Sequence, residues 1–111
     1  MNFREFENFI DIEDGRLKNC YGDYSSKENE VLFKMTKVTE EVGELCSEIL
    51  AKFSRQRKEK LNSYSDEKLA EELIDIVITL SLLARSLDID IEKTLIKKIE
   101  KIEKRHQDNK N

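Results

Sequence analysis

The chain has 111 residues, a length typical of one domain that can bury its own core. Charged residues make up 40% of it. Leu, Ile, Val and Phe together account for 32 of the 111 residues, a share above the roughly 20% below which highly charged chains stay disordered. With no proline, three glycines and a net charge of −4, the composition excludes a turn-rich β fold and argues against a nucleic-acid polymer as partner.

Several features indicate a cytoplasmic protein without a membrane partner. The first residues lack the apolar run of a secretory signal. The most apolar stretch, residues 76–84, is too short to span a bilayer. Cys20 and Cys46 have a spacing that fits neither a metal site nor a disulfide framework, so both are expected to stay reduced.

A first helix is predicted near the N-terminus. Apolar residues recur at helical spacing from Phe3 to Tyr21, and a glycine- and serine-containing stretch at residues 22–26 then interrupts the pattern. Residues 1–27 are therefore expected to form an N-terminal helix and a turn.

A second helix should begin near Ser25, which forms a capping-box pattern with Glu28. Its apolar residues keep a spacing of three or four over more than six turns, which predicts one continuous face toward a core. These residues are Val31, Met35, Val38, Val42, Leu45, Ile49 and Phe53.

A third helix is predicted from Ser65, because a serine followed by two acids suits the start of a helix. This helix is apolar on nearly every side, with Ile74, Ile78 and Leu82 outside its main stripe. Such a helix is either the centre of a bundle or part of an interface between copies of the chain, so a homo-oligomer is expected.

Asp88 or Asp90 can cap a last helix, whose apolar residues run from Ile91 to Ile102. Residues 106–111 are expected to fray. Four helices with short connections predict a single all-α domain over residues 1–111, a four-helix bundle that oligomerisation would complete.

Two pairs of acids occupy matching positions on the second and third helices. Glu41 and Glu44 lie three and six residues after a core position, and Glu72 and Asp75 do so on the third helix. At about 100° per residue, both pairs have the same angular offset from the apolar stripe. If the two helices pack antiparallel, the four carboxylates can converge at the rim of the core.

Four neighbouring carboxylates repel one another unless a cation lies between them. Ligands that offer only oxygen select a hard cation such as Mg²⁺ or Mn²⁺ over zinc, and Mg²⁺ commonly also binds substrate phosphates. The alternative is that these acids are ordinary solvated helix surface. Asp75 favours a site, because aspartate is rare in an apolar helix unless it has a partner.

Basic residues repeat the same offset on the last helix. Lys98 and Lys101 lie three and six residues after an apolar position, and Arg105 follows one turn later. Lys37 precedes Glu41 by one turn. These four side chains are candidates for binding phosphate oxygens.

At these residues the sequence resembles the MazG-like, all-α nucleotide pyrophosphohydrolases. Their signature, E-E-x-x-E followed by E-x-x-D, corresponds to Glu40-Glu41-Val42-Gly43-Glu44 and, after 27 further residues, to Glu72-Leu73-Ile74-Asp75. The resemblance extends from about Glu28 to Arg105.

The resemblance implies Mg²⁺-dependent hydrolysis of a nucleoside triphosphate, NTP or dNTP, to the monophosphate and pyrophosphate, as in house-cleaning of the nucleotide pool. It implies that Glu40 orients or deprotonates the attacking water, that Glu41 is catalytic as well as a metal ligand, and that the chain forms a dimer or tetramer. The residues expected to ligate the metal are Glu41, Glu44, Glu72 and Asp75, and those expected to bind phosphate are Lys37, Lys98, Lys101 and Arg105.

Three other interpretations compete with this one. The chain could be a non-catalytic helical module that binds partners through its acids, or a relative that acts on another pyrophosphate such as phosphoribosyl-ATP. A ferritin-like di-iron bundle is disfavoured, because it needs two Glu-x-x-His motifs and the chain has one histidine. There is no tryptophan to stack on a base, and Phe33, Tyr24 and Tyr64 could either serve that purpose or simply pack.

Overall fold

The computed structural model describes residues 1–22 and 24–109 and contains helices without strands over that part of the chain. The all-α prediction is confirmed. No helix in the described ranges is both long and apolar enough to cross a membrane. In chain order the helices are α1 (Phe3–Tyr21), α2 (Lys27–Lys52), α3 (Lys58–Asn62), α4 (Asp66–Ser86) and α5 (Ile91–Asn109).

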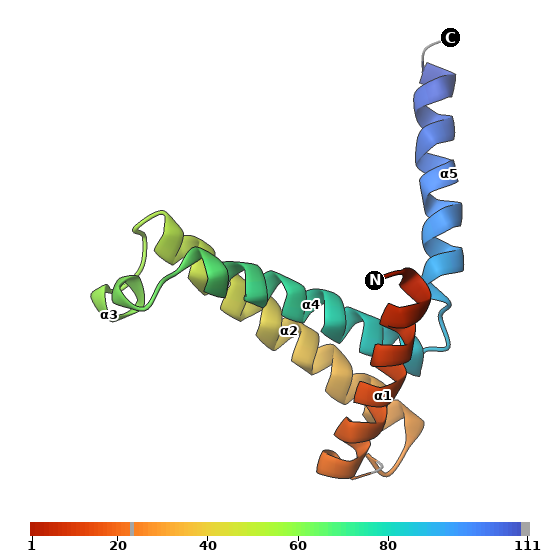
Figure 1. Ribbon diagram of the computed structural model, residues 1–111, viewed down its shortest axis with the longest axis horizontal. Coiled ribbons are helices and arrows are strands. Elements are labelled where there is room, and N and C mark those ends of the chain that lie inside the picture. The colour runs from red at the N-terminus through yellow and green to blue at the C-terminus, as the bar shows by residue number, and fades with distance from the viewer. Residues whose placement is uncertain (23, 110–111) are drawn as a thin grey trace.

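The long helices α2 and α4 lie side by side and run in opposite directions, as expected (Figure 1). The short helix α3 lies at one end of this pair, where the chain turns back. At the other end α1 crosses the pair, and α5 projects away from it. Within one chain, α2 and α4 therefore form a pair rather than a closed bundle.

The start of α2 differs from the prediction by one residue. Ser26, not Ser25, is the N-cap, and its side chain accepts a hydrogen bond from the backbone N–H of Asn29 at 3.1 Å. The reason is backbone conformation: an N-cap is extended, as Ser26 is, whereas Ser25 has a φ of 63° in the left-handed region. Before this turn, α1 ends ahead of Gly22, whose φ of 78° favours glycine.

The later helix starts follow the predicted capping chemistry. Ser65 accepts a hydrogen bond from the backbone N–H of Lys68 at 3.1 Å. Of the two candidates for α5, Asp90 is the cap, because its side chain accepts from the Lys93 N–H at 3.0 Å. Asp88 instead has a φ of 57° and belongs to the turn.

Helix α5 continues through His106 to Asn109, so residues 106–109 are helical where fraying was expected. Residues 110 and 111 of the predicted frayed tail lie outside the described residues.

The predicted core face of α2 is only partly covered within the single chain. Val31, Val38 and Leu45 are half-buried, whereas Met35, Val42, Ile49 and Phe53 are exposed. The face that meets α4 lies one position earlier, about 100° around the helix, and buries the charged residues Lys34 and Glu48. Apolar periodicity identified an apolar face, but α4 covers the neighbouring one.

Apolar side chains are also exposed on α4 and α5. Among the described residues, the apolar side chains that count as buried are Ile10, Ala51 and Leu82. Of the three α4 residues expected to need cover from another copy, Leu82 is buried within the chain, Ile78 is half-buried and Ile74 is exposed. The exposed apolar residues of α5 are Leu95, Ile96, Ile99 and Ile102.

Candidate metal centre

Carboxylates from α2 and α4 converge at the middle of the helix pair. Glu41 on α2 and Glu72 and Asp75 on α4 each offer an oxygen, and these oxygens all lie within 4.8 Å of one another. The antiparallel packing brings the two i,i+3 patterns together, because residues three apart lie on one face of a helix. Three of the four predicted ligands therefore form a compact cluster.

Glu44, the fourth predicted ligand, lies close enough to affect the ionisation of this cluster. Burial raises the pKa of Glu41 above its ordinary value of 4.5, and the charges of Glu44 and Asp75 raise it further. Burial likewise raises the pKa of Glu72, with Glu44 as the next cause. Burial and the neighbouring negative charges thus disfavour ionisation of Glu41 and Glu72 when no cation is present.

Two oxygens of the cluster are buried without a partner. The Oε2 atoms of Glu41 and Glu72 have no hydrogen bond to any described residue. A buried carboxylate oxygen is normally satisfied by a donor or a metal ion, so these atoms are open to ligation. The donor set consists of oxygen alone and therefore fits a hard divalent cation.

Glu40 and Lys37 lie at the edge of the cluster and contact each other. Lys37 Nζ is 3.0 Å from Glu40 Oε2, and both side chains are substantially exposed. This ion pair raises the pKa of Lys37, so its ammonium stays charged. Glu40 also adds to the negative charge that raises the pKa of Glu41.

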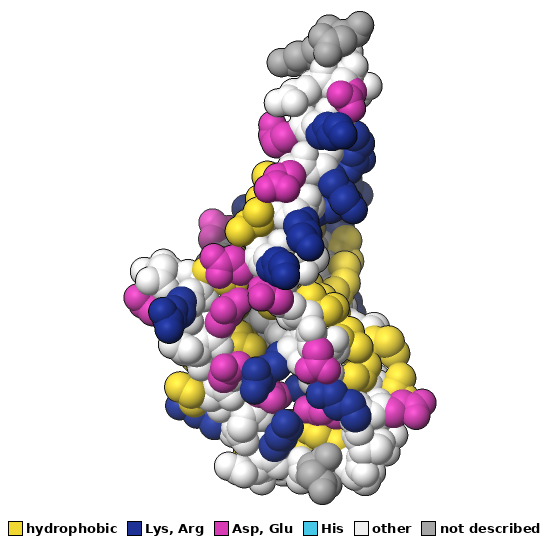
Figure 2. Space-filling view, turned by 90° about the vertical axis from the view of Figure 1, so that its right-hand side faces the viewer, with side chains coloured by type: hydrophobic (Ala, Val, Ile, Leu, Met, Phe, Trp, Pro, Cys, Tyr) yellow, Lys and Arg dark blue, Asp and Glu magenta, His cyan; other side chains and the backbone are white. Residues whose placement is uncertain are grey.

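The other predicted phosphate ligands are separated from the carboxylates within one chain. Lys98, Lys101 and Arg105 are exposed on α5, which projects away from the α2–α4 pair (Figure 1). Figure 2 shows Lys and Arg side chains gathered along this helix, with apolar side chains uncovered below it.

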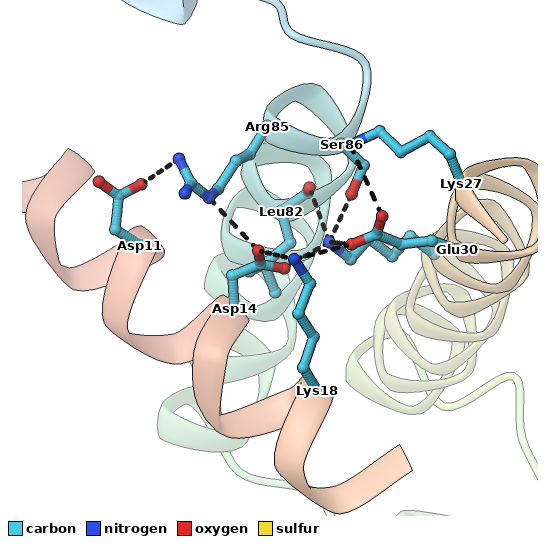
Figure 3. Close-up of polar contacts among 9 residues, drawn as sticks. Asp11, Asp14, Lys18, Lys27, Glu30, Leu82, Arg85 and Ser86 are labelled. Carbon is cyan, nitrogen blue, oxygen red and sulfur yellow. Dashed lines mark hydrogen bonds and ion pairs between the residues drawn. The ribbon is translucent and has the colours of Figure 1, made fainter. Parts of the chain in front are cut away.

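A buried ionic cluster near the end of α4 was not predicted (Figure 3). Lys34 on α2 is 3% exposed and donates hydrogen bonds to Asp14 on α1 and to Ser86 on α4. Its Nζ also lies 3.3 Å from Glu30 Oε1. Arg85 Nε contacts the second oxygen of Asp14 at 3.3 Å. The contacts join all three helices; the i,i+4 spacing of Glu30 and Lys34 was the available sequence signal.

A cavity of about 310 Å³ is lined both by Lys34 of this ionic cluster and by carboxylates of the candidate centre. Glu41 and Asp75 line it together with Lys37. The aromatic residues Tyr21, Tyr24 and Phe33 line it as well. Tyr24 and Phe33 are candidates for base stacking from the sequence, but helical spacing alone does not place them beside the acids.

Comparison with known proteins identifies the family. Residues 30–109 match the family model described as the MazG nucleotide pyrophosphohydrolase domain. No curated protein and no solved structure matched the chain. The family model covers well over half of the sequence, including all four carboxylates of the candidate centre. The chain therefore belongs to the MazG nucleotide pyrophosphohydrolase family.

Proposed function

We propose that the protein hydrolyses a nucleoside triphosphate, NTP or dNTP, to the monophosphate and pyrophosphate with the help of Mg²⁺. The observation that carries the proposal is the set of carboxylate oxygens within 4.8 Å, two of whose residues have a buried, unpartnered oxygen among the described atoms. Glu41, Glu72 and Asp75 would hold the cation, with Glu44 beside them. Mn²⁺ should substitute, since it accepts the same oxygen ligands.

The residues around the cluster have separate roles in activating the water and binding the phosphates. When bound, the cation would neutralise phosphate charge and lower the pKa of a coordinated water. Glu40 adjoins the cluster and is exposed, so it can orient that water or take its proton, with Glu41 helping to fix the geometry. Lys37 carries a positive charge at the same edge and can bind a phosphate oxygen.

Metal binding and turnover can be measured separately. Millimolar Mg²⁺ or Mn²⁺ should raise the melting temperature, because a ligand at about 100 times its dissociation constant stabilises a fold by about 2.7 kcal/mol. NaCl at equal ionic strength is the control. Pyrophosphate release should then be measured with each common NTP and dNTP and with phosphoribosyl-ATP.

No melting shift with either metal, together with no pyrophosphate from any nucleotide, would contradict the proposal and favour a non-catalytic interaction module. Hydrolysis of phosphoribosyl-ATP alone would keep the chemistry but change the substrate.

We further propose that two or four copies assemble and that α5 of one copy serves the carboxylates of another. Exposed apolar rows on α2, α4 and α5 need cover, and apolar surface of this extent is unusual for a monomer. The projecting α5 carries Lys98, Lys101 and Arg105 beside such a row. Between copies, this helix could bring its positive charge to a phosphate tail.

Subunit mixing tests this arrangement. Glu72→Gln and Lys101→Ala homo-oligomers should each be impaired, and exchange of their subunits should restore part of the activity. In a mixed oligomer, one carboxylate site is intact and receives Lys101 from the other copy. Mixing Glu72→Gln with Asp75→Asn is the control and should restore nothing, because every site then lacks a ligand. A light-scattering mass equal to the 13.1 kDa chain would contradict the assembly.

A further inference from the structure

The cavity lined by Glu41 and Asp75 also has a wall of aromatic side chains, formed by Tyr21, Tyr24 and Phe33. Phe33 of α2 is at its centre, with ring centroids 5.0 Å from Tyr21 and 5.2 Å from Tyr24. The rings are tilted by 50° and 43°, so neither pair is stacked face to face. The three rings therefore form an angled apolar surface and do not fill the cavity with a closed stack.

Lys37 connects this aromatic wall with the acids. Its Nζ lies 5.6 Å from the centroid of the Phe33 ring and 3.0 Å from Glu40 Oε2. Glu41 and Asp75 line the same cavity. A molecule that occupied it could place a flat ring against the aromatic side chains and a negatively charged group past Lys37 toward the carboxylates.

The Tyr24 hydroxyl is buried and has no hydrogen-bond partner among the described residues. Burial raises the pKa of this group, and the negative charges of Asp14 and Glu30 add to the effect. The hydroxyl therefore stays protonated at neutral pH and can both donate and accept a hydrogen bond. A buried hydroxyl without a hydrogen-bond partner is energetically unfavourable. This points to a ligand that supplies the missing hydrogen bond.

Resting on the hydrolysis proposed above, we infer that Tyr21, Tyr24 and Phe33 form the subsite for the base of the nucleotide. Aromatic side chains stack on any base, and the Tyr24 hydroxyl would read a polar edge. The volume of about 310 Å³ suffices for a base with part of its sugar. The triphosphate then extends past Lys37 to Glu41 and Asp75.

Two of these three rings come from the segment before α2. Tyr21 and Tyr24 precede residue 30, where the match to the family model begins. Contacts of Asp14 with Lys34 and Arg85 hold α1 against α2 and α4 (Figure 3). The selectivity for the base is therefore supplied by the N-terminal segment of this chain, while the chemistry is supplied by the matched domain.

Turnover by three variants tests the subsite. Phe33→Leu keeps an apolar side chain but loses the stacking face, and should raise KM for every nucleotide about tenfold. Tyr24→Phe removes only the hydroxyl and should change the ratio of kcat/KM between bases by about tenfold, while kcat changes little. Tyr64→Phe is the matched control and should behave as wild type, since the Tyr64 hydroxyl bonds to Asp66 outside this cavity.

A binding measurement separates this inference from the hydrolysis. Nucleoside monophosphates of the common bases should bind the metal-free protein in EDTA and quench its tyrosine fluorescence, which no tryptophan obscures. Phe33→Leu should weaken that binding about tenfold. Unchanged affinity and unchanged base preference in both Phe33→Leu and Tyr24→Phe would overturn the subsite even if hydrolysis is intact. Failed hydrolysis with normal, variant-sensitive binding would instead overturn the proposed reaction alone.

Discussion

Glu72→Gln is expected to raise the melting temperature of the metal-free protein while removing its response to Mg²⁺. The pKa of Glu72 in the folded chain lies above its ordinary value, through burial first and the nearby Glu44 next. The folded state therefore binds this proton more tightly than the unfolded chain does. Protonation of Glu72 stabilises the fold at low pH, and this contribution is lost as pH rises through the folded pKa. Deprotonation of this carboxyl therefore opposes folding, and the uncharged amide removes that penalty.

The pH dependence provides a specific check on this reasoning. Wild type in EDTA should become less stable relative to Glu72→Gln as pH rises from below 4.5, the ordinary glutamate value, toward neutrality. With Mg²⁺ the order should reverse, because the metal stabilises wild type and the variant lacks a ligand. Thermal unfolding at matched pH values, with and without metal, measures both differences.

Loss of turnover should accompany the gain in stability. Removing even an indirect partner of a metal typically lowers activity by about 10- to 100-fold, so loss of a direct ligand should lower pyrophosphate release by at least about 100-fold. Glu71→Gln is the control, since it deletes the same charge from the adjacent, exposed position on α4. A Glu72→Gln protein that is fully active, or no more stable than Glu71→Gln without metal, would exclude Glu72 from the centre.

The carboxylate cluster could be predicted because its determinants are local. Two i,i+3 acid pairs lie at equal offsets on two long helices, and antiparallel packing of those helices brings the pairs together. Glu41, Glu72 and Asp75 then meet by geometry alone. The helices were equally accessible from apolar spacing and capping residues such as Ser65.

The features that the sequence did not predict depend on which faces of the helices pack against each other. The stripe containing Met35 and Val42 is the most apolar face of α2. Its spacing does not reveal that α4 packs instead on the adjacent face of α2, which contains Lys34. The direction of α5 is set by the short turn after α4, whose positive φ at Asp88 has no strong sequence signal. The aromatic wall of the cavity depends on where α1 crosses, and therefore on an ion pair between Asp14 and Lys34, 20 positions apart.

Lys34→Met is expected to destabilise the fold by about 3–5 kcal/mol, because it leaves the buried carboxylates of Asp14 and Glu30 without their buried cation. Methionine nearly preserves the length of the side chain, so lost packing contributes little. Lys34 is 3% exposed, and its ammonium is shared between Asp14 and Glu30. Urea unfolding followed by circular dichroism measures the loss.

Lys18→Met is the matched control. Lys18 Nζ also approaches both carboxylates, at 3.5 Å from Asp14 and 3.6 Å from Glu30, but its side chain is 47% exposed. Solvent screens such a pair, so the loss should stay below about 1 kcal/mol. Equal losses in the two variants would show that burial of the Lys34 ammonium has no special weight.

Charge, rather than shape, should account for most of the Lys34→Met loss. Burial alone would raise the pKa of Asp14 and of Glu30, but the hydrogen bonds and charge of Lys34, together with the charge of Lys18 and one further cation at each carboxylate, lower both. Lowered pKa values contribute stability above the ordinary values, and that stability is lost as pH falls through the folded values. The gap between wild type and Lys34→Met should therefore narrow in acid. Adding Asp14→Asn to Lys34→Met should recover part of the loss at neutral pH, because it removes a buried charge that has lost its buried partner Lys34 and keeps only the partly exposed Lys18 and Arg85. A further loss would mean that packing, not charge, holds α1 in place.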